Sequence, residues 1–143
     1  MRLTTIAASL AFVAAIAPAA FAQQVAGREA FRAIYKEMVE IDSSPTTGSC
    51  TKVVQAAQTR LKAAGYADAD LQLIVPPGKP DDGNLVATLR AENPGKKGVL
   101  LMGHIDVVDA KREDWERSPF TLFEENGFFY GRGTADMKGQ AAV

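Results

Sequence analysis

His104 is the single histidine of the 143-residue sequence, and a carboxylate, Asp106, follows it two residues later. In an extended segment, side chains at this spacing project to the same side of the backbone. A carboxylate placed there can accept a hydrogen bond from one imidazole N–H, which fixes the tautomer of a metal-ligating histidine and raises its basicity. A lone His–Asp hydrogen bond in a protein core would explain the pair equally well. The spacing alone therefore leaves a metal site and a structural pair both open.

A glycine-rich segment at residues 130–139 carries the second candidate ligand, Asp136. Three glycines, Gly131, Gly133 and Gly139, predict tight backbone turns on both sides of it. Asp136 also stands at the start of a helix that is predicted to begin at Met137. Taken alone, it could therefore be a helix N-cap as readily as a metal ligand.

Together, the two segments resemble a known family of enzymes. In order and spacing, their residues are similar to the M-twenty metallopeptidases, which are co-catalytic zinc exopeptidases and amidases. That family includes glutamate carboxypeptidase, aminoacylase and succinyl-diaminopimelate desuccinylase. The residues that carry the resemblance are Gly103-His104-Ile105-Asp106-Val107-Val108, Trp115, Pro119-Phe120, Tyr130-Gly131-Arg132-Gly133 and Asp136-Met137-Lys138-Gly139.

The resemblance implies a role for each candidate. His104 would bind one metal ion, Asp136 would bridge two ions, and Asp106 would act as the catalytic helper that orients His104. The implied metal is zinc, as two ions, with cobalt and manganese left open because the ligand types do not separate them. Two such ions can polarise a scissile carbonyl and lower the pKa of a bridging water. The resemblance also implies that the peptide bond after Asp136 is cis.

Other residues that the resemblance implies are missing from this sequence. In the family, a general-base glutamate, an adjacent glutamate ligand, a further acidic ligand and a second histidine all follow the bridging aspartate. Only seven residues follow Asp136 here. We therefore expect residues 23–143 to be the N-terminal portion of a truncated catalytic domain, with a homodimer open only to the full-length protein. Glu124 and Glu125 precede the second motif and are predicted to form a solvated turn.

Residues 1–22 have the pattern of a signal peptide. Arg2 gives a positive start, residues 6–17 are apolar and rich in alanine, and Ala20-Phe21-Ala22 is a small-x-small cleavage site. The apolar run is short for a membrane span, so no stable span is expected after cleavage. An uncleaved N-terminal anchor is the alternative. Either way, we expect a periplasmic or secreted protein.

The composition is typical of a soluble globular protein, with 47% hydrophobic and 23% charged residues. The formal net charge of −1 provides no basic surface for nucleic acid, so no nucleic-acid partner is expected. Cys50 is the one cysteine, which excludes an intrachain disulfide. We predict that it is a small buried residue and not a nucleophile, because no second histidine is present to activate it.

The predicted elements place both motifs in an α/β fold. Apolar residues recur at three- and four-residue steps over residues 27–41, which predicts a helix. A second helix is predicted from a cap at Thr47 or Ser49 to a stop at Gly65. Short apolar runs predict strands over residues 71–75, 84–89, 99–102 and 128–130. The run Val99–Met102 is continuously apolar, as in a strand buried on both faces. This order predicts the α/β class, and the resemblance implies an α/β/α sandwich around a mixed sheet.

The remaining polar and aromatic residues receive structural interpretations. Arg132 and Lys138 are predicted to form ion pairs, although contact with substrate stays open. The serines and threonine of the first inter-helix segment, Ser43, Ser44 and Thr46, are predicted to form a turn that ends the first helix. The aromatic and proline residues between the motifs are predicted to pack their connecting loop; they are Trp115, Pro119, Phe120 and Phe123.

The sequence therefore predicts a metal-dependent hydrolase. It would cleave peptide or amide bonds of small peptides or N-acyl amino acids by a two-zinc mechanism that is complete only in the full-length protein. The alternative is a non-catalytic domain that keeps the fold and a partial metal site. A glutamate pair and a late histidine encoded beyond Val143 would favour the enzyme.

Overall fold

The computed structural model describes residues 27–143, with the exception of residues 94 and 96. The predicted signal peptide, residues 1–22, lies outside the described residues. The chain divides into two units, Met1–Ile34 and Tyr35–Val143, and both candidate motifs belong to the second. Within the described range, no helix has the length and apolar character needed to cross a membrane.

Both predicted helices form, and local signals set their ends. The first covers residues 27–40. The second, α2 (Cys50–Ala63), is capped by Ser49, whose Oγ accepts a hydrogen bond from the Lys52 amide at 3.3 Å. Such a side-chain acceptor satisfies one of the amides that have no partner within the helix. Gly65 ends the helix with φ of +98°, a backbone conformation that glycine adopts at little cost.

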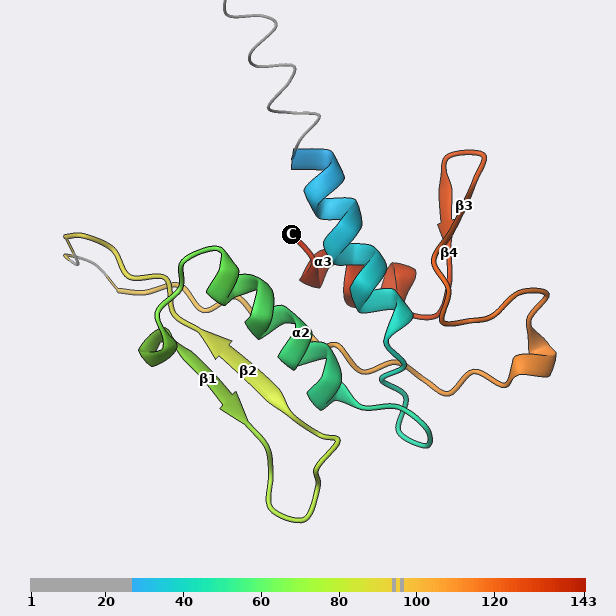
Figure 1. Cartoon of the computed structure of the whole chain (residues 1–143), viewed down its shortest axis with the longest axis horizontal. Coiled ribbons are helices and arrows are strands. Elements are labelled where there is room, and N and C mark those ends of the chain that lie inside the picture. Colours follow the sequence, from blue (N-terminus) through green and yellow to red (C-terminus); the bar gives the residue numbers. More distant parts are fainter. Residues whose placement is uncertain (1–26, 94, 96) are drawn as a thin grey trace, which may run out of the picture. The chain divides into compact units, whose positions relative to one another are not determined.

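Helix α2 packs against a two-stranded antiparallel sheet formed by β1 (Leu71–Ile74) and β2 (Asn84–Ala87) (Figure 1). The two strands were predicted at these positions. Buried Thr51 of α2 forms two hydrogen bonds with the loop between β1 and β2. Its hydroxyl donates to the Pro80 carbonyl at 2.6 Å and accepts from the Gly83 amide at 2.8 Å.

A second antiparallel sheet is the hairpin of β3 (Phe123–Glu125) and β4 (Phe128–Tyr130). Strand β4 confirms the sequence prediction, but the predicted solvated turn at Glu124 and Glu125 is wrong. Both residues lie in β3, and the turn is Asn126–Gly127, with φ values of 52° and 81°. Two successive positive φ values are characteristic of the tight turns that suit the twist of a hairpin.

The predicted buried strand Val99–Met102 is also wrong for the described part of the chain. These residues belong to no sheet there, and their exposed fractions lie between 77% and 89%. An apolar run specifies that a segment favours burial, but it does not specify the element that buries it. The described residues contain no strand that pairs with this run.

The α/β class is confirmed, and in the described residues its strands form two separate antiparallel pairs. The buried apolar core of the second unit contains Tyr35, Met38, Val39, Val53, Val54, Leu71, Val107 and Ala142. Tyr35 also contacts Phe129 of β4 edge to face, with ring centroids 5.3 Å apart.

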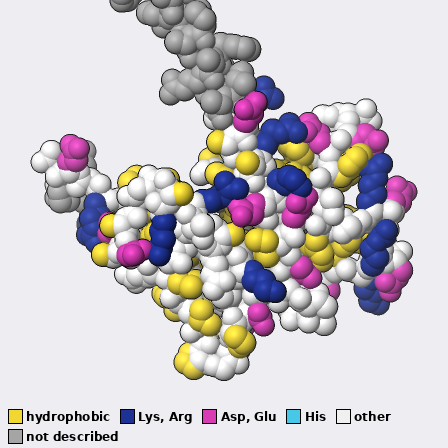
Figure 2. All heavy atoms as spheres, viewed as in Figure 1, with side chains coloured by type: hydrophobic (Ala, Val, Ile, Leu, Met, Phe, Trp, Pro, Cys, Tyr) yellow, Lys and Arg dark blue, Asp and Glu magenta, His cyan; other side chains and the backbone are white. Residues whose placement is uncertain are grey.

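On the face drawn in Figure 2, basic and acidic side chains are interspersed along the right-hand segment around residues 110–118.

Candidate metal site

The three predicted site residues lie together on the surface of the second unit. The Nε2 atom of His104 is 2.9 Å from Oδ1 of Asp136, although 32 residues separate them. The other ring nitrogen, Nδ1, lies 3.2 Å from both the backbone oxygen and Oδ1 of Asp106. The imidazole therefore has one nitrogen directed at each aspartate. The individual roles assigned to these residues stay predictions.

The backbone around Asp136 explains how its carboxylate reaches His104. Asp136 lies inside a wide turn, Thr134–Lys138, and has the non-helical angles φ −136° and ψ 100°. The peptide bond between Asp136 and Met137 is cis, which confirms the expectation from the family resemblance. The short helix α3 (Gly139–Ala141) begins three residues later. Asp136 is therefore not the N-cap of that helix, and its carboxylate is directed at the histidine.

The electrostatics of the site favour the charged form of His104. The side-chain hydrogen bond with Asp136 is the main factor that raises its pKa above 6.5, and the carbonyl and charge of Asp106 add to it. Both ring nitrogens face acceptors, so the imidazolium can donate on both sides. A metal ion needs the neutral ring. Protons and metal ions therefore compete for Nε2.

We expect NMR titration of the 143-residue chain to give a raised pKa for its one histidine, and Asp136→Asn to lower that pKa. Because the folded-state pKa exceeds the unfolded value, the charged ring stabilises the fold below the unfolded value, and this contribution disappears as pH rises through the folded pKa. Metal affinity should change in the opposite direction and weaken as pH falls through the same value. An unchanged His104 pKa in the Asp136→Asn variant would contradict this arrangement.

A hollow of about 220 Å³ opens at the site, and His104, Asp106 and Asp136 all line it together with Arg132 and Thr134. Imidazole and carboxylate are donors that suit zinc and related divalent metals. Asp136 and His104 are accessible, with side-chain exposed fractions of 85% and 47%. The donors present fit a metal ion, but only as part of a site. Among the described residues, no group of three or more His, Cys, Asp and Glu side chains has an arrangement that could hold one.

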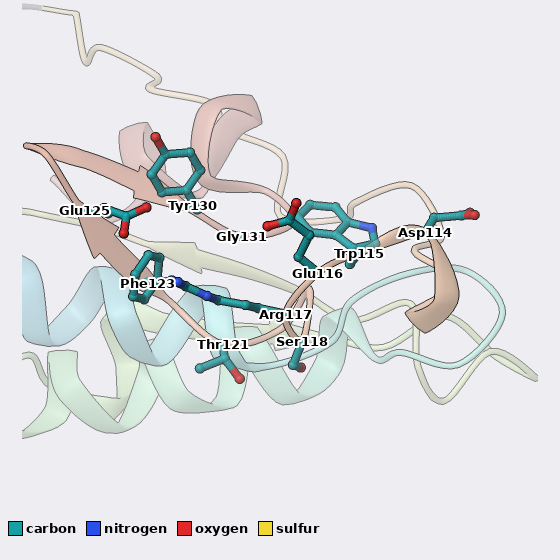
Figure 3. Close-up of a pocket in the computed structure, with 10 residues that line it drawn as sticks. All are labelled: Asp114, Trp115, Glu116, Arg117, Ser118, Thr121, Phe123, Glu125, Tyr130 and Gly131. Carbon is teal, nitrogen blue, oxygen red and sulfur yellow. The ribbon is translucent and has the colours of Figure 1, made fainter.

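A larger hollow, of about 300 Å³, lies beside the β3–β4 hairpin and includes none of the three site residues (Figure 3). Arg117 extends along it, with its guanidinium 3.4 Å from the ring centroid of Phe123. Trp115 lies on the other side of this hollow (Figure 3). The guanidinium carbon of Arg132 stacks on Trp115, 5.2 Å from its ring centroid. Pro119 is buried. These contacts support the prediction that Trp115, Pro119 and Phe123 pack the loop between the motifs, and they give Arg132 a stacking contact in place of the predicted ion pair.

Two residues near the site have roles that the sequence patterns did not indicate. Lys138 is fully buried, and its Nζ donates to the backbone carbonyl of Ile41 at 2.8 Å, contrary to the predicted ion pair. Burial lowers the pKa of Lys138 to about 8, although the negative charge of Asp42 acts to raise it. Ser43 is buried and donates to the carbonyl of Ile105 at 2.6 Å. Partial burial also raises the pKa of the Cys50 thiol, which favours its unreactive form.

Comparison with known proteins defines the class to which this fold and site belong. Acetylornithine deacetylase of Salmonella arizonae is 35% identical over 109 residues, which are 76% of this chain and 28% of the relative. The acetylornithine deacetylases of Salmonella newport and Salmonella dublin match with the same identity and coverage. The chain thus spans 28% of the length of these relatives. By their names, these relatives belong to the class of hydrolase enzymes.

A second comparison gives the family. Residues 100–143 match the peptidase family M20/M25/M40, and this range includes His104, Asp106 and Asp136. The family predicted from the motifs is thereby confirmed for the segment that carries the site, residues 100–143.

Proposed function

We propose that the protein carrying this chain is a zinc-dependent amide hydrolase that acts on N-acyl amino acids or small peptides. The observation that carries the proposal is the approach of His104 and Asp136 to 2.9 Å within the segment that matches the family. The relatives named acetylornithine deacetylase favour an N-acyl amino acid as the substrate class. The pattern of residues 1–22 supports a periplasmic or secreted location.

In this proposal, His104 and Asp136 would hold the metal, and further ligands would come from other parts of the protein. When bound, two zinc ions would polarise the scissile carbonyl and activate a water molecule. The chain's own residues prepare that site. Asp106 accepts from Nδ1 of His104 and so keeps the lone pair of Nε2 directed at the metal position. The exposed carboxylate of Asp136 lies with Oδ1 2.9 Å from Nε2 of His104, where the two side chains would hold a metal ion together.

The proposal is tested by hydrolysis of a panel of N-acetyl amino acids and dipeptides by the protein that carries this segment. We expect activity on at least one N-acyl amino acid, its loss on dialysis against a metal chelator, and its return with Zn²⁺. Restoration by Co²⁺ or Mn²⁺ alone would replace zinc in the proposal. Hydrolysis that survives the chelator would contradict the metal mechanism. The absence of hydrolysis across the panel, in a protein that still binds Zn²⁺, would favour the non-catalytic alternative.

A further inference from the structure

The turn between the first helix and α2, residues 41–49, is tied by hydrogen bonds around the carboxylate of Asp42. One carboxylate oxygen accepts from the Ser44 amide at 2.8 Å, and the other accepts from the Thr47 hydroxyl at 2.7 Å. The Asp42 carbonyl accepts from the Ser49 amide at 2.9 Å. Burial raises the pKa of Asp42, but the bonds from Thr47 and Ser44 outweigh it, and the net pKa is lowered. The turn therefore has a fixed shape.

This turn holds the backbone on both sides of Asp106. The hydroxyl of buried Ser43 donates to the Ile105 carbonyl at 2.6 Å, and the Ser43 carbonyl accepts from the Val107 amide at 3.3 Å. Val107 itself is buried. The segment that carries His104 and Asp106 is thus fixed at two points by a single serine 62 residues away.

The same turn also holds the segment that carries Asp136. Lys138, two residues further on, is fully buried and donates to the Ile41 carbonyl at 2.8 Å. The backbone amide of Lys138 also donates a hydrogen bond to the Gly133 carbonyl at 3.1 Å. Ile41 and Ser43 are only two residues apart. One short stretch of backbone therefore binds both site segments.

We propose that Ser43 and Lys138 are positioning residues that together set the separation between His104 and Asp136, and hence the affinity of the site for a divalent metal. This inference rests on the proposed function, because it takes these two residues to be metal ligands. Groups that orient metal ligands without touching the metal typically change affinity or activity by about 10- to 100-fold when they are replaced. A buried hydroxyl or ammonium with a single backbone acceptor is the kind of contact that can do this.

The test is a Zn²⁺ titration of the 143-residue chain and of its Ser43→Ala and Lys138→Met variants. We expect each variant to bind Zn²⁺ about 10- to 100-fold more weakly than the parent chain. The matched control is Thr46→Ala. Thr46 belongs to the same turn and donates through its hydroxyl to Asp109 at 2.8 Å, but that bond lies at the exposed surface beyond the site. Thr46→Ala should keep the parent affinity within about twofold, and Ser43→Thr, which keeps the hydroxyl, should restore most of it.

A second readout separates this inference from the proposed function. The ¹⁵N shifts of the His104 ring report the hydrogen bonds at Nδ1 and Nε2 in the metal-free chain at one fixed pH. We expect them to change in Ser43→Ala and Lys138→Met but not in Thr46→Ala. If the protein that carries this segment binds no Zn²⁺ while these shifts change as expected in the 143-residue chain, the proposed metal role fails and the positioning role stands.

Folded variants with parent ring shifts and parent Zn²⁺ affinity would overturn the positioning role. Thermal unfolding of every variant establishes which of them are folded. If Ser43→Ala does not fold, Ser43→Cys decides the question, because it keeps the volume and weakens the donor. It should then show the same changes to a smaller extent, and parent behaviour in that variant would equally overturn the role.

Discussion

Replacement of His104 by alanine is expected to reduce the affinity of the chain for Zn²⁺ by about 100-fold or more. The imidazole is that of the single histidine in the sequence, and its Nε2 atom faces Asp136 at 2.9 Å. Loss of a direct ligand should exceed the 10- to 100-fold effect that is typical of residues behind a ligand. What remains is an exposed carboxylate pair, which binds a divalent ion with few bonds and little desolvation. Isothermal titration with Zn²⁺ measures the change.

Glu113→Gln is the matched control for this variant. Glu113 lies in the short helical turn Arg112–Asp114, and its carboxylate takes no part in the hollow around His104. Replacement of the Glu113 carboxylate removes one negative charge from the chain but leaves the site intact. This variant therefore measures how far Zn²⁺ binding depends on surface charge alone. A loss of affinity in Glu113→Gln that matches or exceeds the loss in His104→Ala would mean that Zn²⁺ binds diffusely to surface charge. In the protein that carries this segment, His104→Ala should also abolish hydrolysis of the N-acyl substrate.

Sequence patterns predicted well those features that local interactions determine. Ser49 caps α2 and Gly65 ends it, as side-chain capping and a positive φ require. The hairpin β3–β4 also had a local signal, because Asn126–Gly127 is a typical two-residue hairpin turn. The predicted turn at Glu124 and Glu125 lies two residues before the observed one, because charge favours exposure to solvent but only the Asn-Gly pair favours the positive φ values of the turn.

Features that depend on distant contacts were not predictable in the same way. The run Val99–Met102 is apolar enough to be buried, but its exposure depends on which elements are available to cover it. Ser43 and Lys138 contact backbone carbonyls 62 and 97 residues away in the sequence. Every residue has a backbone carbonyl, so no sequence pattern identifies these acceptors. The motif around His104 and Asp136 could be found because its chemistry resides in side chains. The turn that holds these residues could not.

Gly133→Ala is expected to destabilise the second unit by about 2–5 kcal/mol. Gly133 has φ of +84°, and an L-residue in this left-handed region costs roughly 1–2 kcal/mol. A Cβ at this position would also lie 2.6 Å from Cγ1 of buried Val107 and 3.1 Å from Cδ of Lys138. Overpacking of this kind typically costs about 1–3 kcal/mol more. Urea unfolding, followed by circular dichroism, would measure the difference in the free energy of unfolding.

Gly78→Ala separates the two contributions. Gly78 has a similar φ of +73°, but nothing lies within 4 Å of a Cβ placed on it. Its replacement should cost only the backbone term, about 1–2 kcal/mol. If the two variants lose the same stability, then Val107 and Lys138 move aside without a cost in free energy, and the close contact at Gly133 does not destabilise the fold.

The same clash should also reach the metal site. Val107 follows Asp106 directly, and its amide is one of the two points at which Ser43 holds that segment. Lys138 is the residue that fixes the other segment to Ile41. A methyl group that pushes on both side chains should therefore increase the separation between His104 and Asp136, so that Gly133→Ala weakens Zn²⁺ binding under conditions where the chain is still folded. Gly78→Ala, in the loop between β1 and β2, should leave Zn²⁺ binding unchanged. Equal Zn²⁺ affinities in the two folded variants would show that the packing beneath the site does not control the distance between its ligands.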